Sequence, residues 1–243
     1  MLRVAVFGAR GRMGSQVVAA IEAAPDLELH VAIDAADPIE AASGADVAVD
    51  FTVPTVVMGH IEWCVRQGIA VVVGTTGFDE KRYEQVRGWV ESASGARVLI
   101  ASNFSVAAVL MMRFAAQAAP YFESVEVIEL HHPRKLDAPS GTAVTTAKAI
   151  AAARAAAATP VMPDATATQL EGARGATVDG VRVHSVRLQG LFAHQEVVFG
   201  NPGEMLTIRD DGFDRASYLP GVLLAVRRVL ELPGFTLGID TLL

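Results

Sequence analysis

Short apolar runs alternate with amphipathic segments over the first hundred residues of the chain. The run LRVAVFG at 2–8 is rich in β-branched residues and ends at a glycine, as strands buried on both faces do. The segment after it carries Val17, Val18 and Ile21 on one helical face. Strands that alternate with helices predict an α/β fold with a Rossmann-like, doubly wound parallel sheet. The expected strands, some with a following turn, are 2–8, 27–34, 46–52, 69–77 and 96–104.

The pattern changes after about residue 105. Two long apolar or alanine-rich segments, 104–122 and 141–158, predict helices, and the segment between them, 124–132, predicts a strand. The stretch 159–180 shows little periodicity and predicts a long loop. Three further segments alternate apolar and polar residues, as antiparallel strands with one open face do. These segments are 181–189, 193–200 and 204–211.

These patterns predict two domains. The last helix and the tail, 215–243, can return to the first sheet, so residues 1–104 with 214–243 are expected to form a dinucleotide-binding domain. Residues 105–213 are expected to form a second, α+β domain with an open mixed sheet that binds substrate and mediates oligomerisation. The open face would need a partner, so we expect a homo-oligomer.

Composition and charge exclude several classes of protein. Hydrophobic residues make up 51% of the 243 and charged residues 19%, as in globular proteins. The net charge of −7 argues against nucleic-acid binding, which needs a basic face. The single cysteine, Cys64, permits neither an internal disulfide nor a thiolate metal cluster, and we expect no metal site. With neither a signal-peptide pattern nor a membrane-length apolar run, the sequence predicts a cytoplasmic protein.

The first turn reads Gly8-Ala-Arg-Gly11-Arg-Met-Gly14. Glycines at this spacing let a pyrophosphate approach the N-terminus of the following helix, where N–H groups and the helix dipole favour negative charge. Asp34 ends the second strand, where an acid can accept hydrogen bonds from ribose hydroxyls and so favours NADH. Arg10 and Arg12 can instead bind the 2′-phosphate of NADPH. Considered without the other features, the glycines are also explained by an ordinary tight turn between a strand and a helix.

Two later strand ends also carry turn residues. They are GTTG at 74–77 and ASNF at 101–104. Ligands of open α/β sheets bind beyond the carboxyl ends of the strands, so both turns are expected to border the nicotinamide half of a dinucleotide. Plain loop formation by Gly, Thr and Asn is an equally good explanation of each turn taken alone.

The most polar stretch of the chain is HHPRKLDAPSGT at 131–142, at the junction of a strand and a helix. Ser140 is a plausible N-cap, and the N–H groups of Gly141 and Thr142 then fall in the first turn of the helix. A helix start without an obstructing side chain suits a carboxylate ligand. His131, His132 and Lys135 supply groups that can donate protons near neutral pH. The stretch therefore indicates an acid–base site beside an anion site.

The segment ELHHPRKLDAPSGTA at 129–143 closely resembles the signature of the dihydrodipicolinate reductases, also called 4-hydroxy-tetrahydrodipicolinate reductases, of the diaminopimelate route to lysine. The resemblance extends along the chain through VFGARGRMG, DFT, VVGTTGF, ASNFSVA and GLFAHQEVVFG. It implies an oxidoreductase that reduces 4-hydroxy-tetrahydrodipicolinate to tetrahydrodipicolinate with NADH or NADPH. It also implies a small cyclic dicarboxylate as substrate and a homotetramer as the assembly.

The same resemblance implies roles for individual residues. His131 would be the proton donor, Lys135 a second donor, and His132 a substrate-binding residue. Gly141 and Thr142 would bind a substrate carboxylate. The implied cofactor-binding residues are Gly8, Ala9, Arg10, Gly11, Arg12 and Met13 at the pyrophosphate, Asp34 at the adenosine ribose, and Gly74, Thr75, Thr76, Ala101, Ser102, Asn103 and Phe104 around the nicotinamide.

The residues alone leave two other functions open. Another dehydrogenase of this two-domain architecture, such as an aspartate or sugar dehydrogenase, would share the glycine turn and Asp34. It would not need the His-His-x-x-Lys and Ser-Gly-Thr arrangement. A dinucleotide-sensing regulator would use the same fold without turnover, and its second domain should lack clustered acid–base residues. The polar stretch 131–142 favours an enzyme over a regulator.

Overall fold

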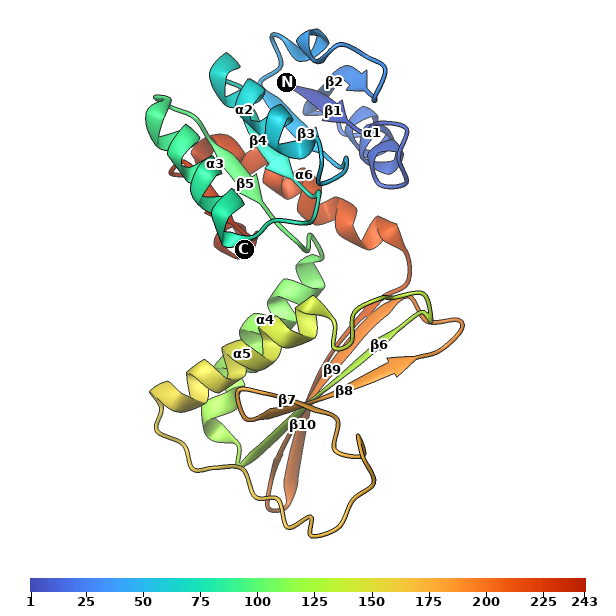
Figure 1. Cartoon of the computed structure of the whole chain (residues 1–243), viewed down its shortest axis with the longest axis vertical. Helices are drawn as coiled ribbons and strands as arrows, with labels where there is room; N and C mark the ends of the chain where they lie inside the picture. Colours follow the sequence, from blue (N-terminus) through green and yellow to red (C-terminus); the bar gives the residue numbers. More distant parts are fainter. The chain divides into compact units, whose positions relative to one another are not determined.

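A computed structural model describes all residues from 1 to 243. The chain forms two compact units, one made of Met1–Val106 with Arg215–Leu243 and the other of Ala107–Asp214. It enters the second unit at the start of helix α4 (Val106–Ala118) and returns to the first unit at a short 3₁₀ helix, η3 (Arg215–Tyr218). Figure 1 labels the elements of both units.

The first unit is built on a six-stranded sheet whose neighbouring strands are all parallel. In space the strands follow the order β11-β5-β4-β3-β1-β2. The chain therefore leaves β1 for β2 on one side and then crosses to β3 on the other side. Sheets of this class bind ligands at such a reversal, beyond the carboxyl ends of the strands. The strands are β1 (Leu2–Phe7), β2 (Leu27–Ile33), β3 (Val47–Asp50), β4 (Ala70–Val73), β5 (Val98–Ile100) and β11 (Phe235–Leu237).

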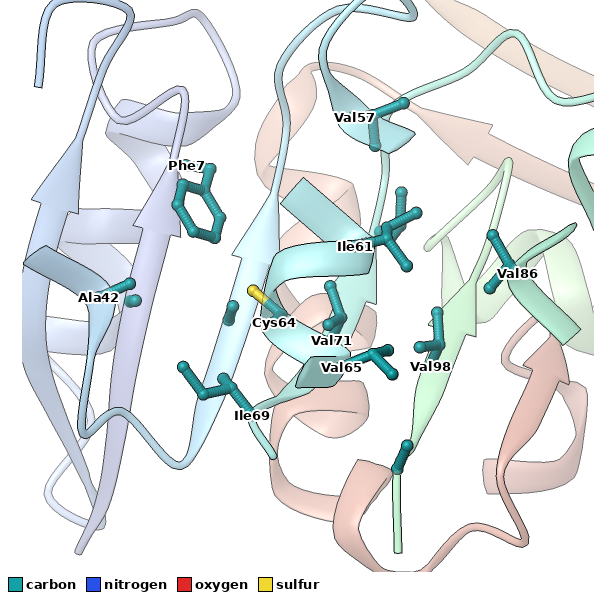
Figure 2. Close-up of a cluster of buried hydrophobic side chains, with 14 of the residues drawn as sticks. Phe7, Ala42, Val57, Ile61, Cys64, Val65, Ile69, Val71, Val86 and Val98 are labelled. Atoms are coloured by element: carbon teal, nitrogen blue, oxygen red, sulfur yellow. The ribbon is translucent and has the colours of Figure 1, made fainter. Parts of the chain in front are cut away.

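Both faces of this sheet are buried. Val71 and Val98 on one face pack with Ile61 of α2 and Val86 of α3 in a single apolar cluster (Figure 2). Successive strand residues point to opposite faces, and Val72, next to Val71, is also fully buried. Burial on both faces explains why these strands are continuously apolar. The helices of the unit are α1 (Gly14–Glu22), α2 (Val57–Gln67), α3 (Glu80–Ser92) and α6 (Leu219–Arg228).

The second unit is a five-stranded mixed sheet, in the order β10-β9-β6-β8-β7, with α4 and α5 on one face (Figure 1). Met111 of α4 and Ile150 of α5 pack against Val127, Val183 and Phe199 of the strands. The residues that alternate with these along the strands are only partly buried, so the opposite face is open. The remaining elements are β6 (Ser124–His131), α5 (Gly141–Ala156), β7 (Ala176–Val178), β8 (Val181–Arg187), β9 (Ala193–Asn201) and β10 (Glu204–Gly212).

The predicted fold class is confirmed, two details of the sequence prediction are wrong, and one helix was not predicted. β8 runs parallel to β6 instead of antiparallel, because helix α5 carries the chain back to the end of the sheet where β6 starts, and Arg154 near the end of α5 donates to the carbonyl of Phe122. The last part of that predicted loop, Ala176–Val178, pairs with β8 as a short strand. Helix α3 was not predicted, since its only buried residues are Val86 and Val90. Its sequence signal was Asp79, whose side chain caps the helix by accepting from the N–H of Arg82.

Three further features of the structure concern the single cysteine, possible metal ligands and possible membrane spans. Cys64 is a free cysteine inside the first core, and burial, with a smaller contribution from the charge of Asp50, raises the pKa of its thiol to about 12. The thiol therefore stays protonated and serves packing. Nowhere do three or more His, Cys, Asp or Glu side chains gather as metal ligands. None of the helices is both long and apolar enough to cross a membrane.

Candidate active site

A cleft of about 600 Å³ lies at the carboxyl ends of the strands of the first unit. Its walls come from the segments that follow β1, β2, β3 and β4, together with His60 of α2 and Arg215. This is the switch point expected from the strand order. The predicted cofactor-binding residues that line it are Gly8, Gly11, Arg12, Met13, Asp34, Gly74, Thr75 and Thr76.

The glycine turn shapes the floor of this cleft. Gly8 adopts φ +75°, and a Cβ there would lie 2.6 Å from the carbonyl oxygen of Phe51. A Cβ on Gly14 would lie 2.0 Å from the carbonyl oxygen of Gly8, so helix α1 can begin this close to the turn only with glycine. No side chain caps the start of α1. This helix N-terminus therefore suits a pyrophosphate.

Asp34 lies directly after β2 in the wall of the cleft. Its carboxylate accepts hydrogen bonds from the backbone N–H of Arg10 at 2.8 Å and of Ala35 at 2.9 Å. These bonds, first that from Ala35 and then that from Arg10, hold the pKa of Asp34 below its ordinary value. A carboxylate anchored and ionised in this way is able to accept hydrogen bonds from a ribose.

Other predicted cofactor residues lie outside the lining of the cleft. Ala9 is buried beneath the turn, and the side chain of Arg10 is 79% exposed, 4.0 Å from Asp37. Residues 101–104 follow β5, the strand beside β4. Of these, Phe104 is buried, and its ring centroid lies 5.9 Å from that of Phe51, which does line the cleft.

A buried network behind the cleft was missed by the sequence analysis. The carboxylate of Asp50 is fully buried and accepts from the hydroxyls of Thr52 and Thr75 at 2.7 Å each. Its other oxygen lies 2.7 Å from Nδ1 of His60, whose ring stacks on Phe7 at 4.8 Å. The network ties the turns after β3 and β4 together, and it uses the Thr75 hydroxyl. The only sequence signal was an acid at the end of an apolar strand, within the DFT segment.

In the second unit, the polar stretch 131–142 joins the end of β6 to the start of α5. Ser140 is the N-cap as predicted, since its hydroxyl accepts from the N–H of Ala143 at 3.2 Å. The N–H groups of Gly141 and Thr142 follow in the first turn of the helix, and Gly141 has no side chain to obstruct a ligand. The two predicted carboxylate-binding residues therefore lie where the helix dipole favours an anion.

His131 forms a hydrogen bond with the carboxylate of Glu129, a residue that the sequence analysis did not single out. Nδ1 of His131 lies 2.5 Å from the carboxylate of Glu129, which is fully buried. Arg187 of β8 donates to both oxygens of Glu129, at 2.8 and 2.9 Å. Burial alone would raise the pKa of Glu129, but hydrogen bonds from His131, Arg187 and Ser185 lower it to about 2. Glu129 is therefore ionised at neutral pH.

Lys135 and Gly141 share one partner, Asp137. Nζ of Lys135 donates to Asp137 at 2.8 Å, and the N–H of Gly141 donates to the other carboxylate oxygen at 3.2 Å. The hydrogen bond from Lys135 is the main cause that lowers the pKa of Asp137. The N–H of Gly141, predicted to bind a substrate carboxylate, thus donates to the carboxylate of Asp137.

His132 has an unsatisfied ring nitrogen. Its Nδ1 is buried and has no hydrogen-bond partner in the protein. Burial is the main cause that lowers the pKa of His132, and the nearby positive charges of Arg134, His131, Lys135 and Arg187 act in the same direction. A neutral imidazole with an unused nitrogen is able to bind a polar ligand group.

Each cluster of side chains fits one half of a redox reaction. The cleft of the first unit offers a glycine turn, an uncapped helix start and an ionised acid, which together suit a dinucleotide. The cluster of the second unit offers side chains that can donate a proton, beside a helix start whose Gly141 N–H donates to the carboxylate of Asp137. Because this helix start accepts a carboxylate, the cluster suits an anionic substrate that must receive a proton.

Comparisons with known proteins show the family to which the chain is similar. The family model described as dihydrodipicolinate reductase, N-terminus, matches residues 2–104, and the corresponding C-terminus model matches residues 107–243. The 4-hydroxy-tetrahydrodipicolinate reductase of Beutenbergia cavernae is 59% identical over 243 residues, covering 100% of this chain and 98% of that protein. The enzyme of the same name from Nocardia farcinica is 59% identical over 244 residues, with the same coverage.

Two solved structures resemble the chain to different degrees. A dipicolinate-bound dihydrodipicolinate reductase from Paenisporosarcina sp. TG-14 matches with a TM-score of 0.89 and 37% identity, covering 100% of both chains. A myo-inositol dehydrogenase from Corynebacterium glutamicum matches with a TM-score of 0.61 and 16% identity, covering 95% of this chain and 89% of that one. The second likeness shows only that sugar dehydrogenases share the fold.

Proposed function

This chain belongs to the dihydrodipicolinate reductase family, and on that premise we propose that it reduces 4-hydroxy-tetrahydrodipicolinate to tetrahydrodipicolinate with NADH or NADPH. The reaction serves lysine biosynthesis through the diaminopimelate pathway. The observation that carries the proposal is the cluster in residues 131–142. There a histidine held by a carboxylate, a lysine and a helix N-terminus come together.

The residues of the second unit have separate tasks in this reaction. When bound, the reduced nicotinamide supplies a hydride to the conjugated imine ring of the substrate. His131 donates the proton that quenches the electron density left on the ring, with Lys135 as a second donor. Gly141 and Thr142 bind one substrate carboxylate at the start of α5, where Asp137 now bonds to Gly141. His132 binds the substrate through its unpaired nitrogen.

The first unit is the proposed cofactor-binding domain. Residues 8–13 lie at the pyrophosphate, Asp34 holds the adenosine ribose, and residues 74–76 with 101–104 frame the nicotinamide. The cleft and the ionised Asp34 support this arrangement. Arg10 and Arg12 give the same site a means to accept the 2′-phosphate of NADPH.

The second unit is the proposed substrate-binding and oligomerisation domain. Its open sheet face carries partly exposed apolar side chains, among them Ile128, Leu130 and Val186. We infer that copies of the chain join through this face as a homotetramer. We infer a cytoplasmic location, which suits a protein with one free cysteine, and neither nucleic acid nor membrane as a partner for a chain of net charge −7.

Turnover by the purified chain tests the proposal. We expect oxidation of NADH and of NADPH only when the cyclic imine made by the preceding synthase of the pathway is present. Oxidation that depends instead on an amino-acid or sugar substrate would identify another dehydrogenase. Binding of the dinucleotide without turnover of any of these substrates would identify a sensing regulator.

A further inference from the structure

The carboxylate of Glu129 lies at the centre of the proton-donor cluster. It is fully buried on the face of β6 that packs under α5, in the inward series of Val125 and Val127. Its oxygens meet Nδ1 of His131 at 2.5 Å and both terminal nitrogens of Arg187 at 2.8 and 2.9 Å. Burial of a carboxylate costs free energy unless such partners compensate its charge. An apolar residue would fill the same space without this cost, so packing alone does not explain Glu129.

The same carboxylate also fixes the start of α5. The backbone N–H of Ser140 donates to Glu129 at 3.2 Å, and Ser140 is the N-cap directly before Gly141. Arg187, while bound to Glu129, also donates to the backbone carbonyl of Asp137 at 2.7 Å. One side chain thus links the proton donor, the polar loop and the helix N-terminus that is proposed to bind the substrate.

A carboxylate at Nδ1 sets the state of a histidine. It accepts the Nδ1 proton and leaves Nε2 as the nitrogen that exchanges a proton. It also stabilises the doubly protonated ring, because an opposite charge favours the charged form. The low pKa of Glu129, about 2, means that this negative charge is present at all working pH values.

We propose that Glu129 is a positioning residue for the reductase reaction, which fixes the tautomer of His131 and stabilises its protonated, donating form. This role rests on the proposed function, in which His131 delivers the proton. Arg187 has the opposite electrostatic effect on His131, because its positive charge offsets part of the field of Glu129.

The groups around His131 come from the neighbouring strands, the start of α5 and the polar loop. On the neighbouring strands, Arg187 of β8 and the uncharged Ala193 of β9 lie opposite it. The first turn of α5 contains no charged residue. In the loop, His132 is adjacent, Arg134 lies three residues away, and the positive charge of Lys135 is paired with Asp137. Glu129 is the carboxylate in contact with His131, and Arg187 is paired with Glu129, so the effects of the two charges are separable by substitution.

The test compares Glu129→Gln with Arg187→Gln in the full chain. We expect Glu129→Gln to lower kcat about 10²-fold at neutral pH, the scale of a general acid, with partial recovery at lower pH. The alkaline limb of its pH–rate profile should move to lower pH. Arg187→Gln should move the same limb to higher pH. A purely structural ion pair would give both variants the same direction of shift.

Glu126→Gln is the matched control. Glu126 lies on the same strand and is also held by a histidine and an arginine, His184 at 2.6 Å and Arg174 at 2.5 Å. It lies on the open sheet face, away from the proposed substrate and cofactor residues. A Glu126→Gln protein that keeps the wild-type assembly in light scattering should therefore keep the wild-type kcat and pH profile. If Glu129→Gln does not fold because Arg187 is left uncompensated, the double variant Glu129→Gln with Arg187→Gln removes both charges and should retain the shift to lower pH.

Nitrogen NMR of the His131 ring gives a readout that does not depend on turnover. The wild type should show the Nδ1–H tautomer, and Glu129→Gln should lose that preference. Wild-type turnover with unchanged tautomer and pH profile in Glu129→Gln overturns the role of Glu129 alone. A wild type that does not turn over the cyclic imine overturns the proposed function, and the positioning role with it.

Discussion

Replacement of Asp137 by Ala should strengthen the binding of a dicarboxylate. In the free protein Asp137 bridges Nζ of Lys135, at 2.8 Å, and the N–H of Gly141, at 3.2 Å. Both of these groups are proposed to serve the substrate. A substrate carboxylate must therefore displace the Asp137 carboxylate before it can bind to the start of α5.

The expected gain in ligand affinity follows from the solvent exposure of the ion pair between Asp137 and Lys135. The Asp137 side chain is 53% exposed, so its bond with Lys135 stabilises the free form by at most about 1 kcal/mol. The contact of an exposed anion with a helix N-terminus adds about 0.3–1 kcal/mol, also reduced by solvent. A net value of about 1 kcal/mol corresponds to about fivefold tighter binding of the ligand.

Calorimetric titration with dipicolinate, the ligand of the Paenisporosarcina relative, measures this directly. Asp26→Ala is the control for loss of one negative charge, because Asp26 pairs with Arg227 in the first unit and is 51% exposed. We expect about fivefold tighter binding for Asp137→Ala, an intermediate value for Asp137→Asn and no change for Asp26→Ala. Weaker binding by Asp137→Ala would refute the reasoning, since Asp137 would then help to bind the ligand.

Three further outcomes are expected. Lys135→Ala should lower kcat about 10²-fold in steady-state assays, and near-native turnover would contradict its role as a donor. The wild type should use NADH and NADPH with kcat/KM values within about tenfold of each other. Asp34→Ala should lower kcat/KM selectively for NADH, and Arg10→Ala combined with Arg12→Ala should lower it selectively for NADPH. A variant with an unchanged ratio of the two kcat/KM values would show that the replaced side chain does not contact the ribose. Because folding lowers the pKa of Glu129 from 4.5 to about 2, its contribution of about 3 kcal/mol is present above pH 4.5 and is lost as the pH falls toward 2. Acid unfolding of Glu129→Gln should lack this component, and an unchanged acid transition would argue against it.

The parallel sheet and the cap of α5 could be predicted because they depend on local information. A strand buried on both faces must be continuously apolar, and Val71 and Val72 satisfy this within two residues. Ser140 caps its helix through a bond to Ala143, three residues away. Gly14 is required by a contact with the carbonyl of Gly8, six residues away, whereas the close approach at Gly8 is to Phe51 of another segment. The apolar strand, the cap and Gly14 are decided by neighbours in sequence.

Elements whose identity depends on distant partners were predicted poorly. The direction of β8 against β6 depends on where an excursion of the chain returns, which alternation of apolar residues does not reveal. Helix α3 buries only Val86 and Val90 fully, while Tyr83 and Trp89 pack at the edge of the core, and contacts with α2 hold the helix in place. In both cases the deciding contacts lie outside the segment itself.

By itself, the sequence determined the fold class, the glycine turn and the placement of two histidines and a lysine just before a helix start, because periodicity, capping and turn chemistry act over a few residues. Only the tertiary structure decided what those side chains contact. Arg187 meets Glu129 across 58 residues of chain because β8 pairs with β6 in one particular register. Thr75 meets Asp50 across 25 residues because β3 and β4 are adjacent. Sheet register fixes such contacts, and a shift of β8 by one residue would turn Arg187 to the other face of the sheet, away from Glu129.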